Sequence, residues 1–184
     1  AYRIPSVRTM VIEDKAAVAR IPFFGNGTAE AMAQFLRDHR SAPAVVIDLR
    51  DNEAGTMAEV VAAADLFLDP GSIVVNQGRE RAQLAPVTAE KPAVWVRSVV
   101  VLVNQGTRGV AEASAAALKD NGRGILVGTR SAGLAVASSV YPAGRGYVMK
   151  VADMHLASPS GLSWSERGLA PNVVVESTGL SLPV

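Results

Sequence analysis

Continuous apolar runs that alternate with helical segments constrain the fold of this chain more than any other feature. The runs are residues 44–49 (AVVIDL), 99–104 (VVVLVN) and 125–128 (ILVG), each bounded by polar or glycine-rich turns. Uninterrupted runs of this length are typical of parallel strands covered on both faces. Residues 56–68 and 110–122 separate them and predict helices. The sequence therefore predicts an α/β fold whose mainly parallel strands are joined by right-handed helical crossovers.

The N-terminal part of the chain adds a strand and a helix ahead of the first apolar run. Residues 18–24 are largely apolar and lead into a Gly-Asn-Gly turn, which predicts a short strand. Thr28 is a candidate N-cap for the segment that follows. In that segment Met32, Phe35 and Leu36 fall on one helical face, so we expect an amphipathic helix.

The C-terminal half departs from this alternation after Gly133. Residues 72–78 still predict a strand of the repeating series, and residues 79–91 predict a polar connection. Beyond Gly133, glycine-rich turns and alternating apolar residues are typical of antiparallel hairpins. Residues 177–184 predict a flexible tail. We expect a single domain over residues 1–184, because a chain of this length can bury one substantial core.

The composition of the chain excludes several classes of function. Hydrophobic residues make up 49% of the chain and charged residues 19%, which indicates an ordered globular protein. The formal net charge is +1 and the basic residues are scattered, so we predict no nucleic-acid partner. No stretch approaches the roughly 18 to 20 apolar residues that span a bilayer. Cysteine is absent, which excludes disulfides and thiolate metal sites. The chain starts at Ala1 without a visible signal peptide, so we expect a processed or trimmed chain.

Two polar loops are the candidate sites of chemistry. Residues 50–55 (RDNEAG) follow the first apolar run, and residues 104–109 (NQGTRG) follow the second. Ligands bind beyond the carboxyl ends of parallel strands in open α/β sheets. Each loop leads into a helix N-terminus, whose free backbone N–H groups can hold a carboxylate or an oxyanion. The loops therefore predict an anion or oxyanion pocket, with ordinary strand-to-helix turn chemistry as the alternative.

Four ordered blocks of the chain carry a resemblance to a known family. The blocks are residues 45–55, 64–74, 99–133 and 157–175. They resemble, in order and spacing, the protease core of the C-terminal processing, or tail-specific, serine peptidases. The resemblance covers residues 18–176 and implies the crotonase-like α/β architecture of that family. It also implies that the family's peptide-binding PDZ module is not present in this chain.

The resemblance implies where catalytic residues would lie, and the chain departs from the family at each position. The family's elbow reads Ser-Ala-Ser-Ala-Ser-Glu with its third residue as nucleophile, and Gly109 takes that place. The family's general base is the Lys of a Phe-Gly-Lys-Gly turn, where this chain has Leu134. The Gln that orients the Lys corresponds to Ser138. The family's oxyanion donors are backbone N–H groups, which here would belong to Gly109 and to Ala54 or Gly55.

These substitutions remove the chemistry of a Ser–Lys mechanism. Glycine has no side chain that can attack a carbonyl group, and leucine cannot accept a proton, so Gly109 and Leu134 cannot replace a serine and a lysine. The remaining pocket of backbone N–H groups could still hold an acyl group or a peptide carboxylate. Thr107, two positions before Gly109, is the alternative nucleophile of a relocated site.

Other polar residues near the two loops predict no additional chemistry. Glu112 matches the family's residue in the first turn of its helix, where we expect it to complement the helix dipole. Neither His39 nor His155 has a partner at a catalytic spacing. The acidic residues within 48–53 are followed by no ligand pattern of a calcium or magnesium loop. We therefore predict no metal and no cofactor.

The sequence predicts a catalytically silent homologue of a tail-specific peptidase, a pseudoenzyme that serves as a peptide-binding, scaffolding or assembly domain. The expected partner is a peptide or protein, such as an unfolded or C-terminal tail. A homo-oligomer or a complex with an active relative is a further expectation, because folds of this kind often bury apolar surface between subunits. The alternative is an active serine-type hydrolase with a relocated nucleophile such as Thr107. The family resemblance implies the bacterial periplasm or cell envelope.

Overall fold

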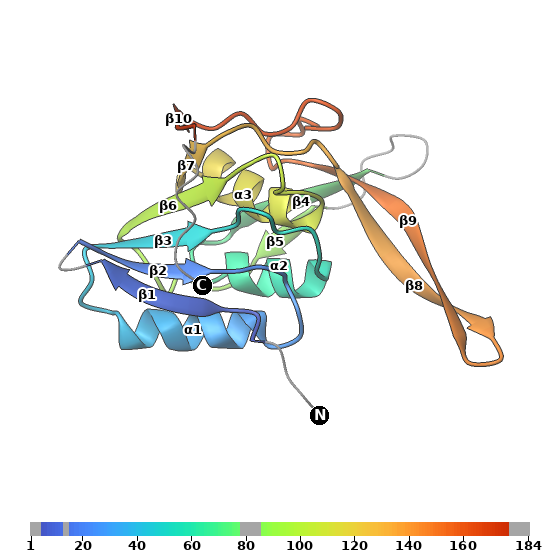
Figure 1. Ribbon diagram of the computed structural model, residues 1–184, viewed down its shortest axis with the longest axis horizontal. Helices are drawn as coiled ribbons and strands as arrows, with labels where there is room; N and C mark the ends of the chain where they lie inside the picture. Colours follow the sequence, from blue (N-terminus) through green and yellow to red (C-terminus); the bar gives the residue numbers. More distant parts are fainter. Residues whose placement is uncertain (1–4, 13–14, 78–85, 177–184) are drawn as a thin grey trace.

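The computed structural model describes residues 5–12, 15–77 and 86–176 (Figure 1). Within these residues no helix is long and apolar enough to cross a membrane. The tail at residues 177–184 lies outside the described residues. In chain order the elements are β1 (Arg8–Ile12), β2 (Ala16–Arg20), α1 (Thr28–Asp38), β3 (Ala44–Asp48), α2 (Met57–Ala64), β4 (Gly71–Gln77), β5 (Val87–Ala89), β6 (Ser98–Val103), α3 (Val110–Asp120), β7 (Ile125–Gly128), β8 (Val136–Gly144), β9 (Tyr147–Ala157) and β10 (Val173–Val174).

Six strands form the main sheet, in the order β1-β2-β3-β6-β7-β10. Neighbouring strands from β2 to β10 run parallel, and β1 closes the other edge as an antiparallel neighbour of β2. The three uninterrupted apolar runs supply β3, β6 and β7, so the predicted parallel sheet is confirmed. The strand predicted over residues 18–24 lies at 16–20 instead, because Pro22 cannot donate to a strand ladder.

The three helices pack in order along one face of the main sheet, with α1 beside α2 and α2 beside α3. The strand order advances in one direction from β2 to β7, so crossovers of one hand all return over the same face. Val45 and Ile47 point into this layer and are buried. Val46 and Val100, on the opposite face, are only half-buried. The expectation that both faces are covered is therefore confirmed for the helical face alone.

The two N-terminal helices begin with different caps. The predicted apolar face of α1 is buried, but its N-cap is Gly27, with φ 86° and no side-chain hydrogen bond. Thr28 lies inside the helix, where its hydroxyl donates to the Gly25 carbonyl at 2.6 Å. The prediction of Thr28 as the cap is therefore wrong by one residue. In α2, Thr56 caps as its position suggests, because its hydroxyl accepts from the Glu59 amide at 3.3 Å.

The remaining four strands form a separate antiparallel sheet, in the order β5-β4-β9-β8. β4 pairs antiparallel with β5 and with the end of β9, so the expectation that residues 72–78 continue the parallel series is wrong. An apolar strand reads the same in either sheet, and only its neighbours decide which sheet it joins. β5 lies within the connection predicted to be polar, of which residues 78–85 are outside the described part. β4 contacts α3 and β5 contacts α2, so this second sheet lies against the helices.

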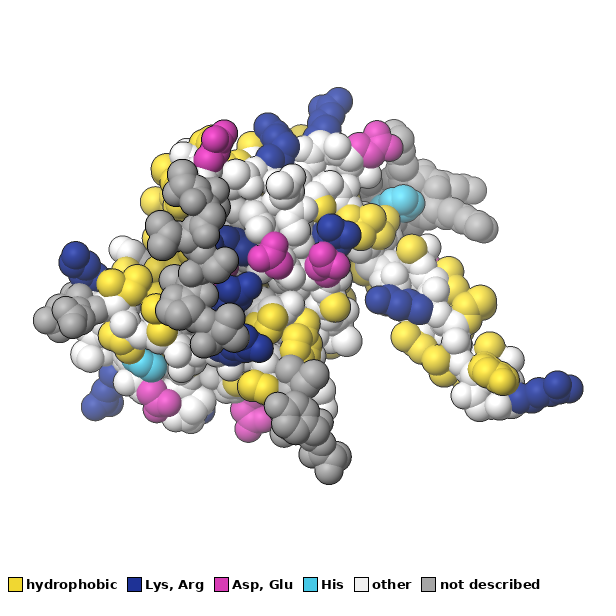
Figure 2. Space-filling model, viewed as in Figure 1, with side chains coloured by type: hydrophobic (Ala, Val, Ile, Leu, Met, Phe, Trp, Pro, Cys, Tyr) yellow, Lys and Arg dark blue, Asp and Glu magenta, His cyan; other side chains and the backbone are white. Residues whose placement is uncertain are grey.

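The β8–β9 hairpin projects from the body of the molecule (Figure 1). The two strands pair from Val136 with His155 to Gly144 with Tyr147, which confirms the predicted antiparallel character of this region. Only the base of the hairpin joins the second sheet, because β4 pairs with residues 155–157 alone. All residues from 140 to 150 are exposed, including Tyr147 at 73%, and Figure 2 shows apolar side chains along the projecting part.

A carboxylate at the end of α3 holds the loop after β9. Asp120 Oδ2 accepts from the Ser160 hydroxyl at 2.7 Å and from the Ser160 amide at 3.2 Å. Burial opposes the charged form of Asp120, but hydrogen bonding by Ser158 and Ser160 and the charge of Lys119 outweigh it and lower the pKa below its ordinary value of 3.8. The contact therefore stabilises the fold above about pH 4 and is lost as the pH falls through the lowered pKa.

We expect Asp120→Asn to flatten this acid dependence. The wild type should lose part of its free energy of unfolding between pH 5 and pH 3, because a carboxylate with a lowered pKa must then be protonated. The variant should start from a lower value at pH 5 and lose less over the same interval. Urea unfolding at the two pH values measures both slopes, and equal slopes would contradict the role of this carboxylate.

Candidate functional site

The two polar loops meet at the carboxyl edge of the main sheet. β3 and β6 are parallel neighbours, so the loops that follow them leave the sheet side by side. The Arg108 amide donates to the Asn52 carbonyl at 3.0 Å. Asn104 Nδ2 donates to Asp51 Oδ1 at 2.8 Å, and Asn104 Oδ1 accepts from the Asp51 amide at 3.0 Å. Backbone and side-chain bonds thus hold the loops together as one frame.

Thr107 is a structural part of this frame. Its side chain is fully buried, and its hydroxyl donates to the Leu49 carbonyl at 2.9 Å. The same oxygen accepts from the Asn104 amide at 3.1 Å. The Thr107 carbonyl accepts from the Ala132 amide at 3.0 Å, which ties the turn at residues 131–134 to the two loops. The hydroxyl proposed as an alternative nucleophile is therefore enclosed and already bonded.

Gly109 adopts the conformation of a sharp strand-to-helix elbow. Its backbone angles are φ 63° and ψ −123°, which a residue with a side chain rarely adopts. Such a turn is the geometry that presents a nucleophile above an α/β sheet. A Cβ atom at this position would find one heavy atom within 4 Å, the Val136 carbonyl oxygen at 3.7 Å. The elbow therefore has the shape and the room for a side chain that it does not carry.

The buried carboxylate of Glu112 joins the elbow to the turn at residues 131–134. Its Oε2 accepts from the amides of Gly109 and Leu134, at 3.0 and 2.9 Å. Its Oε1 accepts from the Ser131 hydroxyl at 2.5 Å and from the Gly133 amide at 2.7 Å. Because the amides of Gly109 and Leu134 share one oxygen, the positions predicted to correspond to the nucleophile and the base lie next to each other. The interpretation of Glu112 as a residue that complements the helix dipole is therefore too weak.

Leu134 and Ser138 are the residues that the sequence analysis predicted at the positions of the base and of its orienting Gln. Leu134 is 47% exposed, so an apolar side chain contacts solvent at the turn that Glu112 joins to the elbow. Ser138 is exposed on β8, beside an irregularity in its pairing with β9. The turn that carries Leu134 is fixed from outside as well, because the Gly133 carbonyl accepts from the Glu166 amide at 2.8 Å.

The loop predicted to supply further oxyanion donors is pinned against Phe24. The Ala54 carbonyl accepts from the Phe24 amide at 2.9 Å, and the Thr56 amide donates to the Phe24 carbonyl at 3.0 Å. A Cβ atom on Gly55 would lie 2.5 Å from that of Phe24, so only glycine fits. The Gly109 amide, the other predicted donor, is bonded to Glu112. An incoming oxyanion would have to compete with that carboxylate for the amide.

The acidic residues near the loops are bonded to protein groups. Asp48 is fully buried and pairs with Arg50, whose Nη2 lies 2.7 Å from Asp48 Oδ2. This hydrogen bond is the main reason that the pKa of Arg50 is raised. Over residues 5–12, 15–77 and 86–176, no three His, Asp or Glu side chains come together in a group that could hold a metal ion.

A family model described as "Peptidase family S41" matches residues 15–175 of this chain. The carboxy-terminal-processing protease of Bartonella bacilliformis is 33% identical over 138 residues, which cover 71% of this chain and 30% of that protein. This chain belongs to peptidase family S41. A CtpA-like serine protease of Staphylococcus aureus is 26% identical over 167 residues, which cover 89% of this chain and 34% of that protein. The chain thus spans about a third of the length of these relatives, and the resemblance found in its sequence is confirmed.

Two solved structures superpose closely on this chain. The photosystem II D1 C-terminal processing protease matches with a TM-score of 0.83 at 24% identity, over 95% of this chain and 49% of that one. A lipoprotein from Streptococcus agalactiae matches with a TM-score of 0.76 at 13% identity, over 93% of this chain and 65% of that one. At these identities the likeness concerns the fold, a mixed α/β architecture with a parallel sheet.

Glu112 and Ser131 are the site residues that the sequence analysis undervalued. Ser131 donates to Glu112 and accepts from the Leu169 amide at 2.7 Å, so it connects the elbow to the closing segment at residues 168–171. A signal for Glu112 was present in the sequence. Residues 110–118 are small or apolar apart from Glu112 and Ser114, so this S41 helix has no polar face to expose a charge.

Proposed function

We propose that this chain is a catalytically silent member of family S41 that binds an extended peptide at its elbow. The observation that carries the proposal is the pairing of Gly109 and Leu134 at adjacent positions of an intact elbow. The backbone that would position a nucleophile and a base is complete, but Gly109 has no side chain and Leu134 has no basic group. An intact site without catalytic groups favours binding of a peptide over its cleavage.

Peptide binding is supported by the surroundings of the elbow. A Cβ atom on Gly109 would meet only the Val136 carbonyl oxygen within 4 Å, and Leu134, whose amide shares a Glu112 oxygen with the Gly109 amide, is exposed. The Arg108 side chain is 42% exposed and lies 3.6 Å from Glu53, a weak surface ion pair that a peptide carboxylate could replace. These features suit a chain end or an extended segment with an apolar residue, such as an unfolded or C-terminal tail.

Two alternatives remain distinct from this proposal. A relocated Thr107 nucleophile would require its enclosed hydroxyl to leave the Leu49 carbonyl, and no general base stands within hydrogen-bond distance of it in the described residues. Assembly with a second copy or with an active relative is compatible with peptide binding, and size measurement with and without the relative separates the two.

We further propose a crotonase-like arrangement for this part of the protein, and a location in the bacterial periplasm or cell envelope. The stepwise strand order β2-β3-β6-β7, with its helices on one face and a second sheet against them, supports the first part. The location rests on the family resemblance.

We expect the purified chain to cleave a fluorogenic peptide at least about 10⁴-fold more slowly than an active S41 relative, because nucleophile and base are both missing. An acyl-type serine probe should leave it unlabelled, as mass spectrometry would show. Turnover that disappears in Thr107→Val, or a probe adduct on Thr107, would overturn the proposal in favour of the relocated nucleophile.

Introducing the family's catalytic residues tests whether positions 109, 134 and 138 account for the proposed lack of peptidase activity. Gly109→Ser with Leu134→Lys and Ser138→Gln should restore probe labelling at residue 109, since the elbow has room for the side chain. The matched control is Gly109→Ser alone, which lacks a base and should stay unlabelled. Failure of the triple variant to react, with its fold intact by circular dichroism, would contradict the view that these three substitutions account for the silence.

Binding is tested with fluorescently labelled unfolded casein. Leu134→Glu should weaken its binding about fivefold or more, because an apolar contact becomes a charge at the elbow. Leu162→Glu is the matched control, because it makes the same substitution at another exposed leucine, which is 72% exposed. Equal effects of the two substitutions would argue against a peptide site at the elbow.

A further inference from the structure

A concave site lies at the opposite end of the main sheet from the elbow. It is a pocket of about 370 Å³ between the end of α1 and residues 94–97. These segments precede β3 and β6, whereas the elbow follows β6, and the two strands pair in parallel from Ala44 with Ser98. The pocket is therefore separate from the peptidase-like site.

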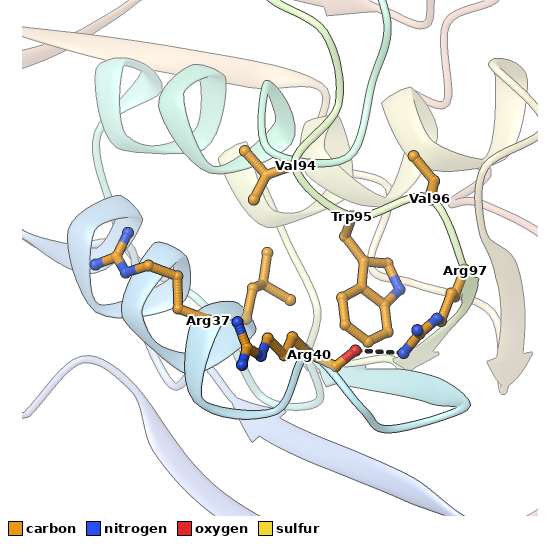
Figure 3. A pocket seen from close by; sticks show the side chains of 7 residues that line it. Arg37, Arg40, Val94, Trp95, Val96 and Arg97 are labelled. Atoms are coloured by element: carbon orange, nitrogen blue, oxygen red, sulfur yellow. Dashed lines mark hydrogen bonds between the residues drawn. The ribbon is translucent and has the colours of Figure 1, made fainter.

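The floor and one wall of the pocket are apolar. Trp95 is 4% exposed, and its indole Nε1 donates to the Ser98 carbonyl at 3.3 Å, so the ring is fixed in place. Val94 is 57% exposed and lines the same pocket. Figure 3 shows Val94 and the Trp95 ring facing the end of α1 across the pocket.

Three arginines line the pocket. Arg97 donates to the carbonyls of Arg40 and Ala42, the second at 3.0 Å, and its guanidinium carbon lies 5.8 Å from the centroid of the Trp95 ring. Arg37 donates to Gln34 Oε1 from Nε and Nη2. The Arg40 side chain makes neither a hydrogen bond nor an ion pair with any described residue. Arg40 is exposed, and a guanidinium group carries five N–H donors.

The pocket lacks compensating negative charge among the described residues. The ion pairs of the described residues involve Arg20, Arg50 and Arg108, and none of these arginines lines the pocket. The neighbouring carboxylate of Asp38 accepts from Gln34 Nε2 at 2.7 Å and lies more than 4 Å from each pocket guanidinium. The guanidinium groups of Arg40 and Arg97 beside an apolar hollow therefore form a locally cationic and amphipathic site, while the Arg37 side chain points away from the Trp95 ring (Figure 3).

We propose that this pocket binds an acidic peptide segment in which a carboxylate side chain stands next to a large aliphatic one. Guanidinium groups match planar carboxylates by paired hydrogen bonds, and the apolar hollow would take the neighbouring side chain. The concave shape favours an inserted side chain over contact with a lipid surface, which apolar side chains reach by projecting outward. The volume suits one large side chain rather than an acyl chain.

The test uses a fluorescein-labelled, capped peptide Gly-Asp-Leu-Glu-Gly and its amide twin Gly-Asn-Leu-Gln-Gly, titrated against the full chain by fluorescence anisotropy. The acidic peptide should bind at least about tenfold more tightly than the twin, and 0.5 M NaCl should weaken it, because the contacts are charge-dependent and partly exposed. Arg40→Asn should weaken binding about fivefold without a change in melting temperature, since the Arg40 side chain bonds to no group within residues 5–12, 15–77 and 86–176.

One control makes the result specific to the pocket. Arg145→Asn makes the same charge change at the tip of the β8–β9 hairpin and should leave the affinity unchanged. The proposal is overturned if both peptides bind equally, if Arg40→Asn and Arg145→Asn have equal effects, or if phosphatidylglycerol vesicles bind in an Arg40-dependent manner while the acidic peptide does not. Loss of binding in Leu134→Glu would show that the acidic peptide binds at the elbow. That result would overturn the proposed pocket site and leave the proposed function standing.

Discussion

Glu112→Ala should lower the free energy of unfolding by about 4 kcal/mol or more, a large part of the stability of a domain of this size. The substitution leaves three backbone amides and the Ser131 hydroxyl, all of which donate to this carboxylate, without an acceptor. Each buried donor left unpaired costs about 1–3 kcal/mol, and water has little access because the side chain is fully buried. Urea unfolding followed by circular dichroism measures the loss.

Two further variants separate the hydrogen-bond network from the helix dipole. Glu30→Ala removes an exposed acidic residue from the first turn of α1, where only the dipole acts, and should cost less than about 1 kcal/mol. Glu112→Gln keeps the shape of the side chain but turns an NH₂ group toward amide donors, so we expect a loss between the other two. Similar costs for Glu112→Ala and Glu30→Ala would show that the network contributes little.

Gly168→Ala should destabilise the protein by about 4 kcal/mol through a clash with the backbone. A Cβ atom on Gly168 would lie 2.1 Å from the Ser131 carbonyl oxygen, and the residue has φ +67°. The Leu169 amide donates to the Ser131 hydroxyl, and the Ser131 amide donates to the Leu169 carbonyl. The added methyl group would therefore push the closing segment away from the turn that Glu112 holds.

Gly122→Ala provides a matched control for the clash. Gly122 has nearly the same backbone angle, φ +66°, but no heavy atom within 4 Å of the added Cβ. Its cost should be about 1 kcal/mol, the strain of a left-handed alanine alone. The difference between the two variants in thermal unfolding measures the steric contact. A difference close to zero would mean that the closing segment moves aside freely.

The parallel core was predictable because its strands are uninterrupted apolar runs at the spacing of a strand–helix repeat. β4 was assigned to the wrong sheet for a physical reason, since an apolar strand of this kind can pair with either set of neighbours. Chain order cannot distinguish a crossover from an excursion to a second sheet. The half-exposed face of β3 and β6 escaped prediction for a similar reason, because aliphatic side chains occupy it despite partial contact with solvent.

At the elbow, the sequence supplied candidate positions but not the contacts that hold them together. Gly109, Leu134 and Thr107 were identified by position, yet the enclosure of the Thr107 hydroxyl depends on Leu49, which lies 58 residues earlier in the chain. The role of Glu112 depends on a turn that begins 19 residues later. Such contacts come from the meeting of β6, β7 and the closing segment, and no local pattern encodes them.

The projecting β8–β9 hairpin gives this chain two stabilities. Residues 140–150 are exposed on both strands, and a pair of strands without a second layer is marginally stable in water. Amide protons in this part should exchange through local opening, at a free energy far below that of the core. Protease sensitivity of the hairpin would therefore report on fraying, and a thermal melt of the whole protein would not detect it.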